Sequence, residues 1–205
     1  FNYAIDSINN VENITITENT ITATGERYCD GIQTGNNAKN ILIDNNNITC
    51  VCINTTELTS EGAITYGVIG TMLGGNGATN MTVTNNNINL TGTANYGIEL
   101  YWVNTTETHN NNITVNGPFS MGIGYAYSPN GNATQNTITI TGDSTTPINL
   151  ITEEFKPENV GIRIQNGTQN ISITENTITT SDIGGQDTTI HTEPDNVTIA
   201  NNQLT

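Results

Sequence analysis

The stretch NITITENTIT at residues 13–22 decides the fold, because close copies of it recur along the chain. The clearest copies are NILIDNNNIT at 40–49, NMTVTNNNIN at 80–89 and NISITENTIT at 170–179, and weaker ones occupy 108–114, 133–139 and 197–205. Within each copy apolar and polar residues alternate, which is the period of a strand with one buried face. Repetition at a minimum spacing of about 25 residues predicts a solenoid of short strands.

Aligned, the copies give two columns of residues. The first is a column of asparagines: Asn19, Asn46, Asn86, Asn111, Asn136, Asn176 and Asn202. The second, two residues later, is apolar: Ile21, Ile48, Ile88, Ile113, Ile138, Ile178 and Leu204. A second unit, such as Gly31-Ile32 or Gly97-Ile98, lies between copies. We therefore predict about seven coils whose strands stack in parallel, with isoleucines inside and an asparagine ladder satisfying buried polar groups.

This repeat resembles the right-handed parallel β-helices of the pectate-lyase-like superfamily. It is most similar to the Asn/Thr-rich adhesin-like surface proteins of methanogenic archaea, whose coils read N-x-I-T-x-x-N-x-I. The resemblance covers essentially the whole chain and implies an all-β, right-handed parallel β-helix. It carries little information on activity, because enzymes, adhesins and structural proteins share such repeats.

Composition excludes several classes of protein. The 205 residues include 4 Lys+Arg against 19 Asp+Glu, for a net charge of −15. No basic surface can be built from so few cations, so binding to nucleic acid or to an anionic membrane surface is excluded. The poor helix formers Asn and Thr make up over a third of the chain, which excludes a mainly helical protein. No apolar stretch is long enough to span a membrane, and no signal peptide begins at Phe1.

We expect one domain, residues 1–205, interrupted by loops. Insertions relative to the repeat fall at about 51–62, 73–77 and 142–158. The first and last insertions leave from the same corner of the coil. Insertions on one face of a solenoid often form a binding face, and the alternative is neutral sequence drift at a turn that tolerates extra residues.

The three cysteines predict one disulfide. Cys52 aligns with a turn column otherwise occupied by glycines such as Gly25 and Gly92, and Cys29 lies at the far side of the equivalent turn. Cys50 falls in an inward column. We therefore predict a Cys29–Cys52 disulfide and a buried Cys50, with three free thiols as the alternative.

Glycosylation signals of the form N-x-S/T are numerous. They begin at Asn13, Asn47, Asn54, Asn80, Asn89, Asn104, Asn112, Asn132, Asn166, Asn170 and Asn196. A chain rich in Asn and Thr generates some by chance, but together with the acidic charge they favour an extracellular, cell-surface location.

Signals for catalysis and metal binding are weak. Asp30-Gly31-Ile32 resembles a short piece of polygalacturonases, but no second Asp aligns beside Asp30 and the family's Gly-His-Gly element is missing. Without facing carboxylates we predict no catalytic residues. We also predict no cofactor and no metal site, although acidic side chains at Glu153, Glu154, Glu158, Asp182 and Asp187 could bind Ca²⁺.

The aromatic residues of the middle coils are the best candidates for a binding site. Trp102 and Tyr127 align on adjacent coils, with Tyr101 and Tyr125 close in sequence. We expect a flat platform on which a sugar or a partner surface stacks, and the alternative is that the rings cover a strand edge.

These observations predict a non-catalytic extracellular protein, an adhesin-like or stalk module that contacts glycans or cell-surface proteins. One alternative is a self-assembling structural subunit of a fibre, sheath or surface layer, associating head to tail through uncapped solenoid ends. A second alternative is a polysaccharide lyase or hydrolase.

Overall fold

The structure is a computed structural model that describes residues 2–6, 9–26, 28–52, 64–70, 77–142, 159–182, 187–194 and 196–205. All the regular elements in these ranges are strands, β1 to β21. They contain no helix, and therefore no apolar helical segment that could cross a membrane. The predicted all-β class is thus confirmed.

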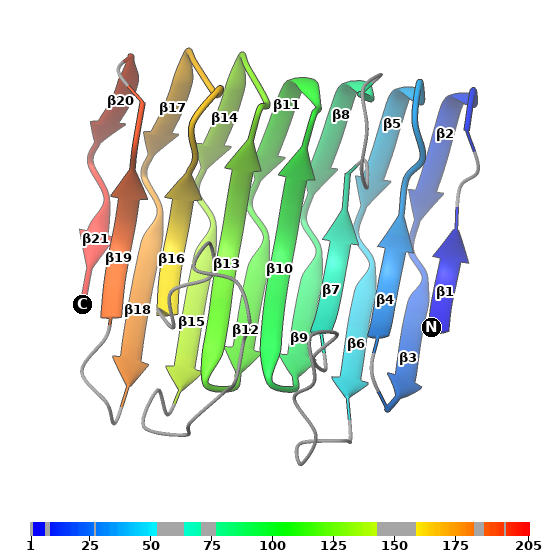
Figure 1. The fold of residues 1–205 in the computed structure, drawn as a ribbon, viewed down its shortest axis with the longest axis horizontal. Helices are drawn as coiled ribbons and strands as arrows, with labels where there is room; N and C mark the ends of the chain where they lie inside the picture. The colour runs from blue at the N-terminus through cyan, green and yellow to red at the C-terminus, as the bar shows by residue number, and fades with distance from the viewer. Residues whose placement is uncertain are drawn as a thin grey trace.

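The strands form three parallel sheets of seven strands each, because every strand pairs with the strand three places along the chain (Figure 1). Sheet A contains β1 (Asn2–Asp6), β4 (Tyr28–Gln33), β7 (Ile64–Ile69), β10 (Ala94–Tyr101), β13 (Phe119–Ala126), β16 (Asn159–Ile164) and β19 (Asp187–Thr192). Sheet B contains β2 (Glu12–Thr17), β5 (Lys39–Asp44), β8 (Thr79–Thr84), β11 (Asn104–His109), β14 (Gly131–Thr134), β17 (Ile171–Thr174) and β20 (Val197–Ala200). Sheet C contains β3 (Thr20–Gly25), β6 (Asn47–Cys52), β9 (Asn87–Thr91), β12 (Asn112–Asn116), β15 (Thr137–Gly142), β18 (Thr177–Asp182) and β21 (Gln203–Leu204).

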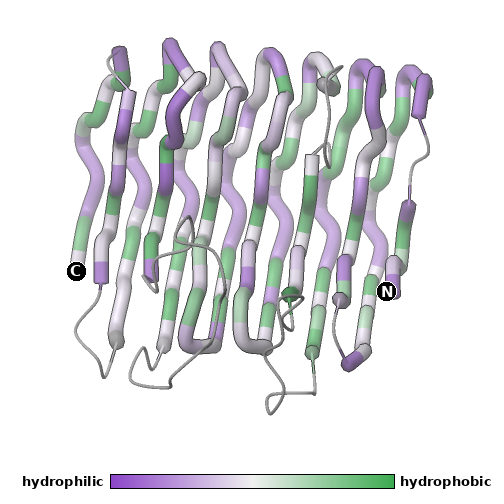
Figure 2. Tube along the Cα trace, viewed as in Figure 1, coloured by the Kyte–Doolittle hydropathy of each residue, from purple (hydrophilic) through white to green (hydrophobic). Residues whose placement is uncertain are grey.

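This arrangement is a parallel β-helix of seven coils, as the repeat predicts. One strand from each sheet makes a coil, and coils stack about 4.8 Å apart, so the seven form a rod about 34 Å long. In sheet C, Ile48 pairs with Ile88 and Ile113 with Ile138, which reproduces the predicted apolar column. These isoleucines have no exposed surface, and the alternation of apolar and polar residues along each strand is visible in Figure 2. The core is therefore a set of apolar columns running along the rod.

The predicted asparagine ladder is also present, at the turn between sheets B and C. Asn86 Nδ2 donates to Asn111 Oδ1 at 3.0 Å, and Asn111 Nδ2 donates to Asn136 Oδ1 at 3.0 Å. The same bond links every neighbouring pair from Asn19 to Asn202. Each internal member also caps a strand carbonyl, as Asn111 does for Val83. The ladder therefore pairs polar groups that burial would otherwise leave unsatisfied.

The expected insertions at 51–62, 73–77 and 142–158 fall mostly on residues 53–63, 71–76 and 143–158, which lie outside the described residues. Their ends are described. Cys52 closes β6 and Gly142 closes β15, both on sheet C, and Ile64 and Asn159 reopen the chain on sheet A. Both long insertions thus connect the same two sheets.

Candidate functional site

The aromatic residues of coils 4 and 5 meet at the turn between sheets A and B. The rings of Trp102 and Tyr127 stack with centroids 4.5 Å apart and planes 6° from parallel. Tyr101, half-buried, meets both rings edge-on, at 6.1 Å from Trp102 and 5.7 Å from Tyr127. Trp102 and Tyr127 remain 37% and 40% exposed. The structure therefore brings together three of the four predicted binding residues.

Two expectations about this cluster need correction. First, the rings stack face to face along the rod instead of lying side by side, so each hides one face of the other and their edges point outward. Second, Tyr125 is fully buried. Its hydroxyl lies 2.8 Å from Thr108 Oγ1 and donates to the Asn132 carbonyl at 3.0 Å. Tyr125 follows the inward residue Ile123 by two positions, so strand alternation directs it into the core.

The backbone at the stack is unusual. Trp102 and Tyr127 have φ angles of 56° and 51°, in the left-handed region. Bulky residues rarely adopt this conformation, and it costs about 1–3 kcal/mol. Register places Asn37 and Gly167 in the same column, at φ 57° and 79°, and these are residue types that tolerate it. The aromatic residues thus oppose local backbone preference, and such outliers cluster at functional sites.

Hydrogen bonds hold the turn beneath the rings in place. Ser128, which is fully buried, accepts from the Val103 backbone N–H at 2.9 Å and donates to the Leu100 carbonyl at 2.7 Å. The Trp102 N–H donates to the Ala126 carbonyl at 2.9 Å. Each bond joins coil 4 to coil 5, so the two rings are positioned by a rigid framework before any ligand arrives.

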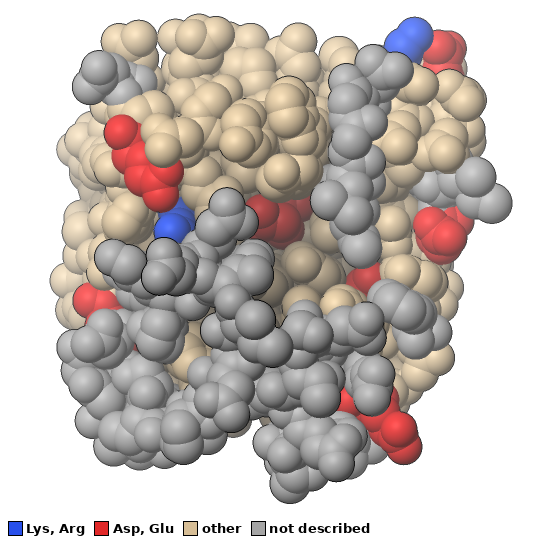
Figure 3. Space-filling model, in the orientation of Figure 1, with Lys and Arg blue, Asp and Glu red and all other residues tan. Residues whose placement is uncertain are grey.

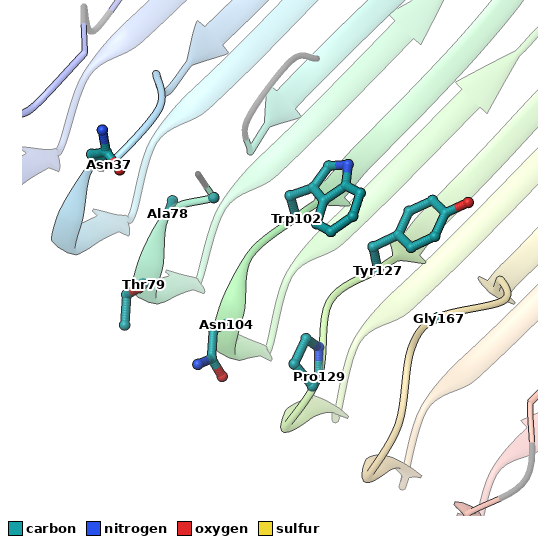
Figure 4. Close-up of a pocket in the computed structure, with 9 residues that line it drawn as sticks. Asn37, Ala78, Thr79, Trp102, Asn104, Tyr127, Pro129 and Gly167 are labelled. Carbon is teal, nitrogen blue, oxygen red and sulfur yellow. The ribbon is translucent and has the colours of Figure 1, made fainter. Parts of the chain in front are cut away.

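The stack lines a shallow trough of about 500 Å³ that runs along the rod (Figure 4). Its polar lining comes from Asn37, Thr79 and Asn104. Its small residues are Gly77, Ala78, Pro129 and Gly167. The lining thus joins aromatic surface to neutral hydrogen-bonding groups.

Two glycines bracket the stack. Gly77, one coil before Trp102, approaches so closely that a Cβ there would overlap the Trp102 carbonyl oxygen. Gly167, one coil after Tyr127, has its backbone against that ring, where a Cβ would lie 2.3 Å from Tyr127 Cδ1. The outer face of Tyr127 is therefore covered, whereas the coil 3 residue opposite Trp102 has no side chain to place over the indole.

A second group of polar residues lies on the outer face of sheet A, where Figure 3 shows acidic atoms at the floor of a hollow. Asp30 is 1% exposed and neither carboxylate oxygen has a hydrogen-bond partner. Burial is the largest cause that raises its pKa, to about 7. Burial likewise raises the pKa of Glu99 to about 7, against the opposing effect of Arg163. Glu99 Oε2 also lacks a hydrogen-bond partner.

These two carboxyl groups do not form a close pair. Asp30 aligns with Tyr66 and Tyr96, whose rings stack at 5.0 Å, whereas Glu99 lies three residues further along its strand. The two positions are thus separated by about 10 Å along the rod and about 10 Å across it. Sequence alignment could not show that these two carboxyl groups are shielded from solvent, because that depends on the surrounding side chains.

The three cysteines differ from the prediction. Cys29, Cys50 and Cys52 are free thiols in the structure, all buried, so the predicted Cys29–Cys52 disulfide is not formed there. Cys29 Sγ donates to the Val51 carbonyl at 3.3 Å, and the thiols of Cys29 and Cys52 are close enough to affect each other's pKa. Burial, followed by the neighbouring Cys29, raises the pKa of Cys52 to about 12, and burial raises that of Cys50 to about 12. Low thiolate content at neutral pH makes such thiols slow to react once the protein has folded.

The predicted glycosylation sites lie mostly on the surface. Of the predicted set, Asn54 falls outside the described residues, Asn89 is half-buried, and the others are exposed. The acidic candidates for Ca²⁺, Glu153, Glu154 and Glu158, also fall outside the described residues. Elsewhere in the described ranges no three His, Cys, Asp or Glu side chains are grouped to hold a metal ion.

A scan of the chain against protein-family models finds no match, and no curated protein matches it either. Its function therefore has to be inferred from the fold and the two groups of residues described above.

Proposed function

We propose that this protein is a non-catalytic, extracellular glycan-binding module of the adhesin-like kind, and that it binds through the Trp102–Tyr127 stack. The observation that carries the proposal is the pair of stacked aromatic rings, held at unfavourable backbone angles yet still more than one-third exposed. Sugars present apolar C–H faces and hydroxyls together, so they suit an aromatic surface bordered by amides.

The rigidity of the turn supports this proposal. Binding normally costs free energy for ordering side chains, about 0.5–1.5 kcal/mol for each one immobilised. Here the rings are already fixed by each other and by the bonds that Ser128 makes between coils. The parallel β-helix, the net charge of −15 and the many exposed sequons also support a cell-surface role.

A glycan array tests the proposal, with the double variant Trp102→Asn/Tyr127→Asn. Asparagine suits this column, because Asn37 and Asn10 already occupy it at positive φ and are joined Nδ2 to Oδ1 at 3.0 Å. The variant should therefore fold normally. Loss of a hot-spot anchor costs about 2 kcal/mol or more, so binding should fall by about 30-fold or more.

The matched control is Thr137→Asn on sheet C. Thr137 is exposed and pairs with Asn112, which already belongs to an exposed asparagine row, so an asparagine fits there too. This variant should bind like the unaltered protein. Undiminished binding by a correctly folded double variant would refute the proposed site.

A second candidate function, a polysaccharide-active enzyme, is favoured by the buried carboxyl groups on sheet A. A carboxyl whose pKa is raised to about 7, as for Glu99, suits general acid or base catalysis at neutral pH. Incubation with the glycans bound on the array, followed by assay for new reducing ends, tests it. Cleavage that Glu99→Gln abolishes would replace the binding proposal with an enzymatic one.

A further inference from the structure

The trough beside Trp102 has a charge pattern that narrows its ligand. The described side chains that line it are uncharged. The cation closest to it in sequence, Lys39, is bound to Glu12 at 3.1 Å and is thereby neutralised. Arg163, the other cation among the described residues, is paired with Glu193 at 3.6 Å, while the chain as a whole carries a net charge of −15. The pattern therefore disfavours an anionic ligand.

The trough also has a direction. Its lining residues come from successive coils, from Asn37 in coil 2 to Gly167 in coil 6. Four coil spacings of about 4.8 Å give a length of about 19 Å, comparable to about four pyranose units in an extended chain. Neutral donors and acceptors come from three successive coils, on Asn37, Thr79 and Asn104, and coil 5 adds the ring of Tyr127. A linear ligand lying parallel to the rod would meet polar groups on coils 2 to 4 and aromatic surface on coils 4 and 5.

The most favourable place for one sugar ring is the coil 3 side of Trp102. Gly77 has no side chain there and Ala78 is buried, while Asn37 on coil 2 and Trp102 on coil 4 line the same trough on either side of these two residues (Figure 4). We call the space between them the gap. A ring in this gap would place its C–H face on the indole and its hydroxyls against the Asn37 and Thr79 side chains. The next units would continue past the outward edges of Trp102 and Tyr127.

We infer that the ligand is a neutral, extended oligosaccharide of about four sugar units, bound parallel to the rod, with one ring on the coil 3 face of Trp102. This inference rests on the proposed glycan-binding function and specifies its ligand class. Acidic chains, such as oligouronides, would be repelled by the net charge of −15 and would find no unpaired cation among the described residues.

Isothermal titration calorimetry tests this with neutral gluco-, manno- and galacto-oligosaccharides of one to six units and with oligogalacturonides of the same lengths. For the neutral series that binds, affinity should rise with length and level off at about four units. Oligogalacturonides should bind at least about tenfold more weakly at low salt, because like charges oppose association. That difference should shrink as salt is raised.

The variant Asn37→Gly adds a positional test. Glycine tolerates the positive φ of Asn37, so the turn should be retained. The variant should weaken binding of neutral oligosaccharides of every length, because the ring on the coil 3 face of Trp102 would place its hydroxyls against the Asn37 side chain. Equal or tighter binding of the acidic series, or no dependence on length, would overturn this inference while leaving the proposed function standing. Failure of every glycan to bind would overturn both.

Discussion

The variant Asn111→Ala tests how much the asparagine ladder stabilises the fold. Asn111 is 1% exposed and takes part in four side-chain hydrogen bonds. Its Nδ2 donates to Val83 O at 2.8 Å and to Asn136 Oδ1 at 3.0 Å. Its Oδ1 accepts from Asn86 Nδ2 and from the Asn86 backbone N–H, both at 3.0 Å. Alanine removes all four bonds without changing the strand pattern.

The expected loss follows from which groups stay paired. Asn86 Nδ2 retains bonds to Ile43 O and Thr84 O, and Asn136 Oδ1 retains the Asn111 backbone N–H. The Val83 carbonyl and the Asn86 backbone N–H lose the partner that they have now. A buried unpaired group costs about 1–3 kcal/mol, so two of them lower the free energy of unfolding by about 2–6 kcal/mol.

Urea unfolding followed by far-UV circular dichroism measures this loss, and Asn112→Ala is the matched control. Asn112 is the next residue and is exposed, and its side chain donates one bond, to Asn87 Oδ1 at 3.0 Å. Its removal should change the free energy of unfolding by less than about 0.5 kcal/mol. The reasoning is refuted if the two variants unfold at the same urea concentration, since burial of the ladder would then contribute nothing.

Three further predictions concern other residues. Tyr125→Phe removes a buried hydroxyl with two partners and should lower the free energy of unfolding by about 1–3 kcal/mol while glycan binding, measured by calorimetry, stays unchanged; loss of binding would return Tyr125 to the site. The pKa of Asp30 rises from its ordinary 3.8 to about 7 on folding, so the folded state holds more protons across that range. The contribution of Asp30 to the free energy of unfolding should be fully present below about pH 4 and should decline as pH rises through 7. Urea unfolding at a series of pH values should show a smaller decline for Asp30→Asn. A free energy of unfolding that rises over that range, or the same pH dependence in the variant, would contradict this. If the protein folds under oxidising conditions, non-reducing peptide mapping should detect a disulfide between Cys29 and Cys52, and Cys50 should be alkylated only after unfolding. A disulfide that involves Cys50 would show that the proximity of the Cys29 and Cys52 thiols does not determine which cysteines pair.

The fold could be predicted from sequence because its determinants repeat. An Asn or an apolar residue recurs at the same place in each of the seven coils, so the repeat is easy to recognise. Aligning the copies then predicts which residues pair between strands, and the pairing of Ile48 with Ile88 confirms this register. Strand alternation alone would also have placed Tyr125 inside, since it lies two residues beyond Ile123. Tyr125 lies only two residues from the exposed Tyr127, and this proximity in sequence hides the fact that its side chain points into the core.

The candidate site was harder to predict because it depends on features that do not repeat. Alignment brought Trp102 and Tyr127 to adjacent coils, but the orientation of the rings follows from a left-handed backbone that only Asn and Gly signal in sequence. The buried state of Asp30 likewise comes from side chains on other coils. Such features require the three-dimensional structure, since no local pattern encodes them.

The central claim, that glycan binds at the aromatic stack, can be measured directly because Trp102 is the one tryptophan of the chain. Its fluorescence should change saturably when a neutral oligosaccharide is added, with the same Kd as calorimetry gives, and acrylamide should quench it less in the complex. A ligand that binds by calorimetry yet leaves both the emission and the quenching of Trp102 unchanged would contradict the claim, because it would have to bind elsewhere on the rod.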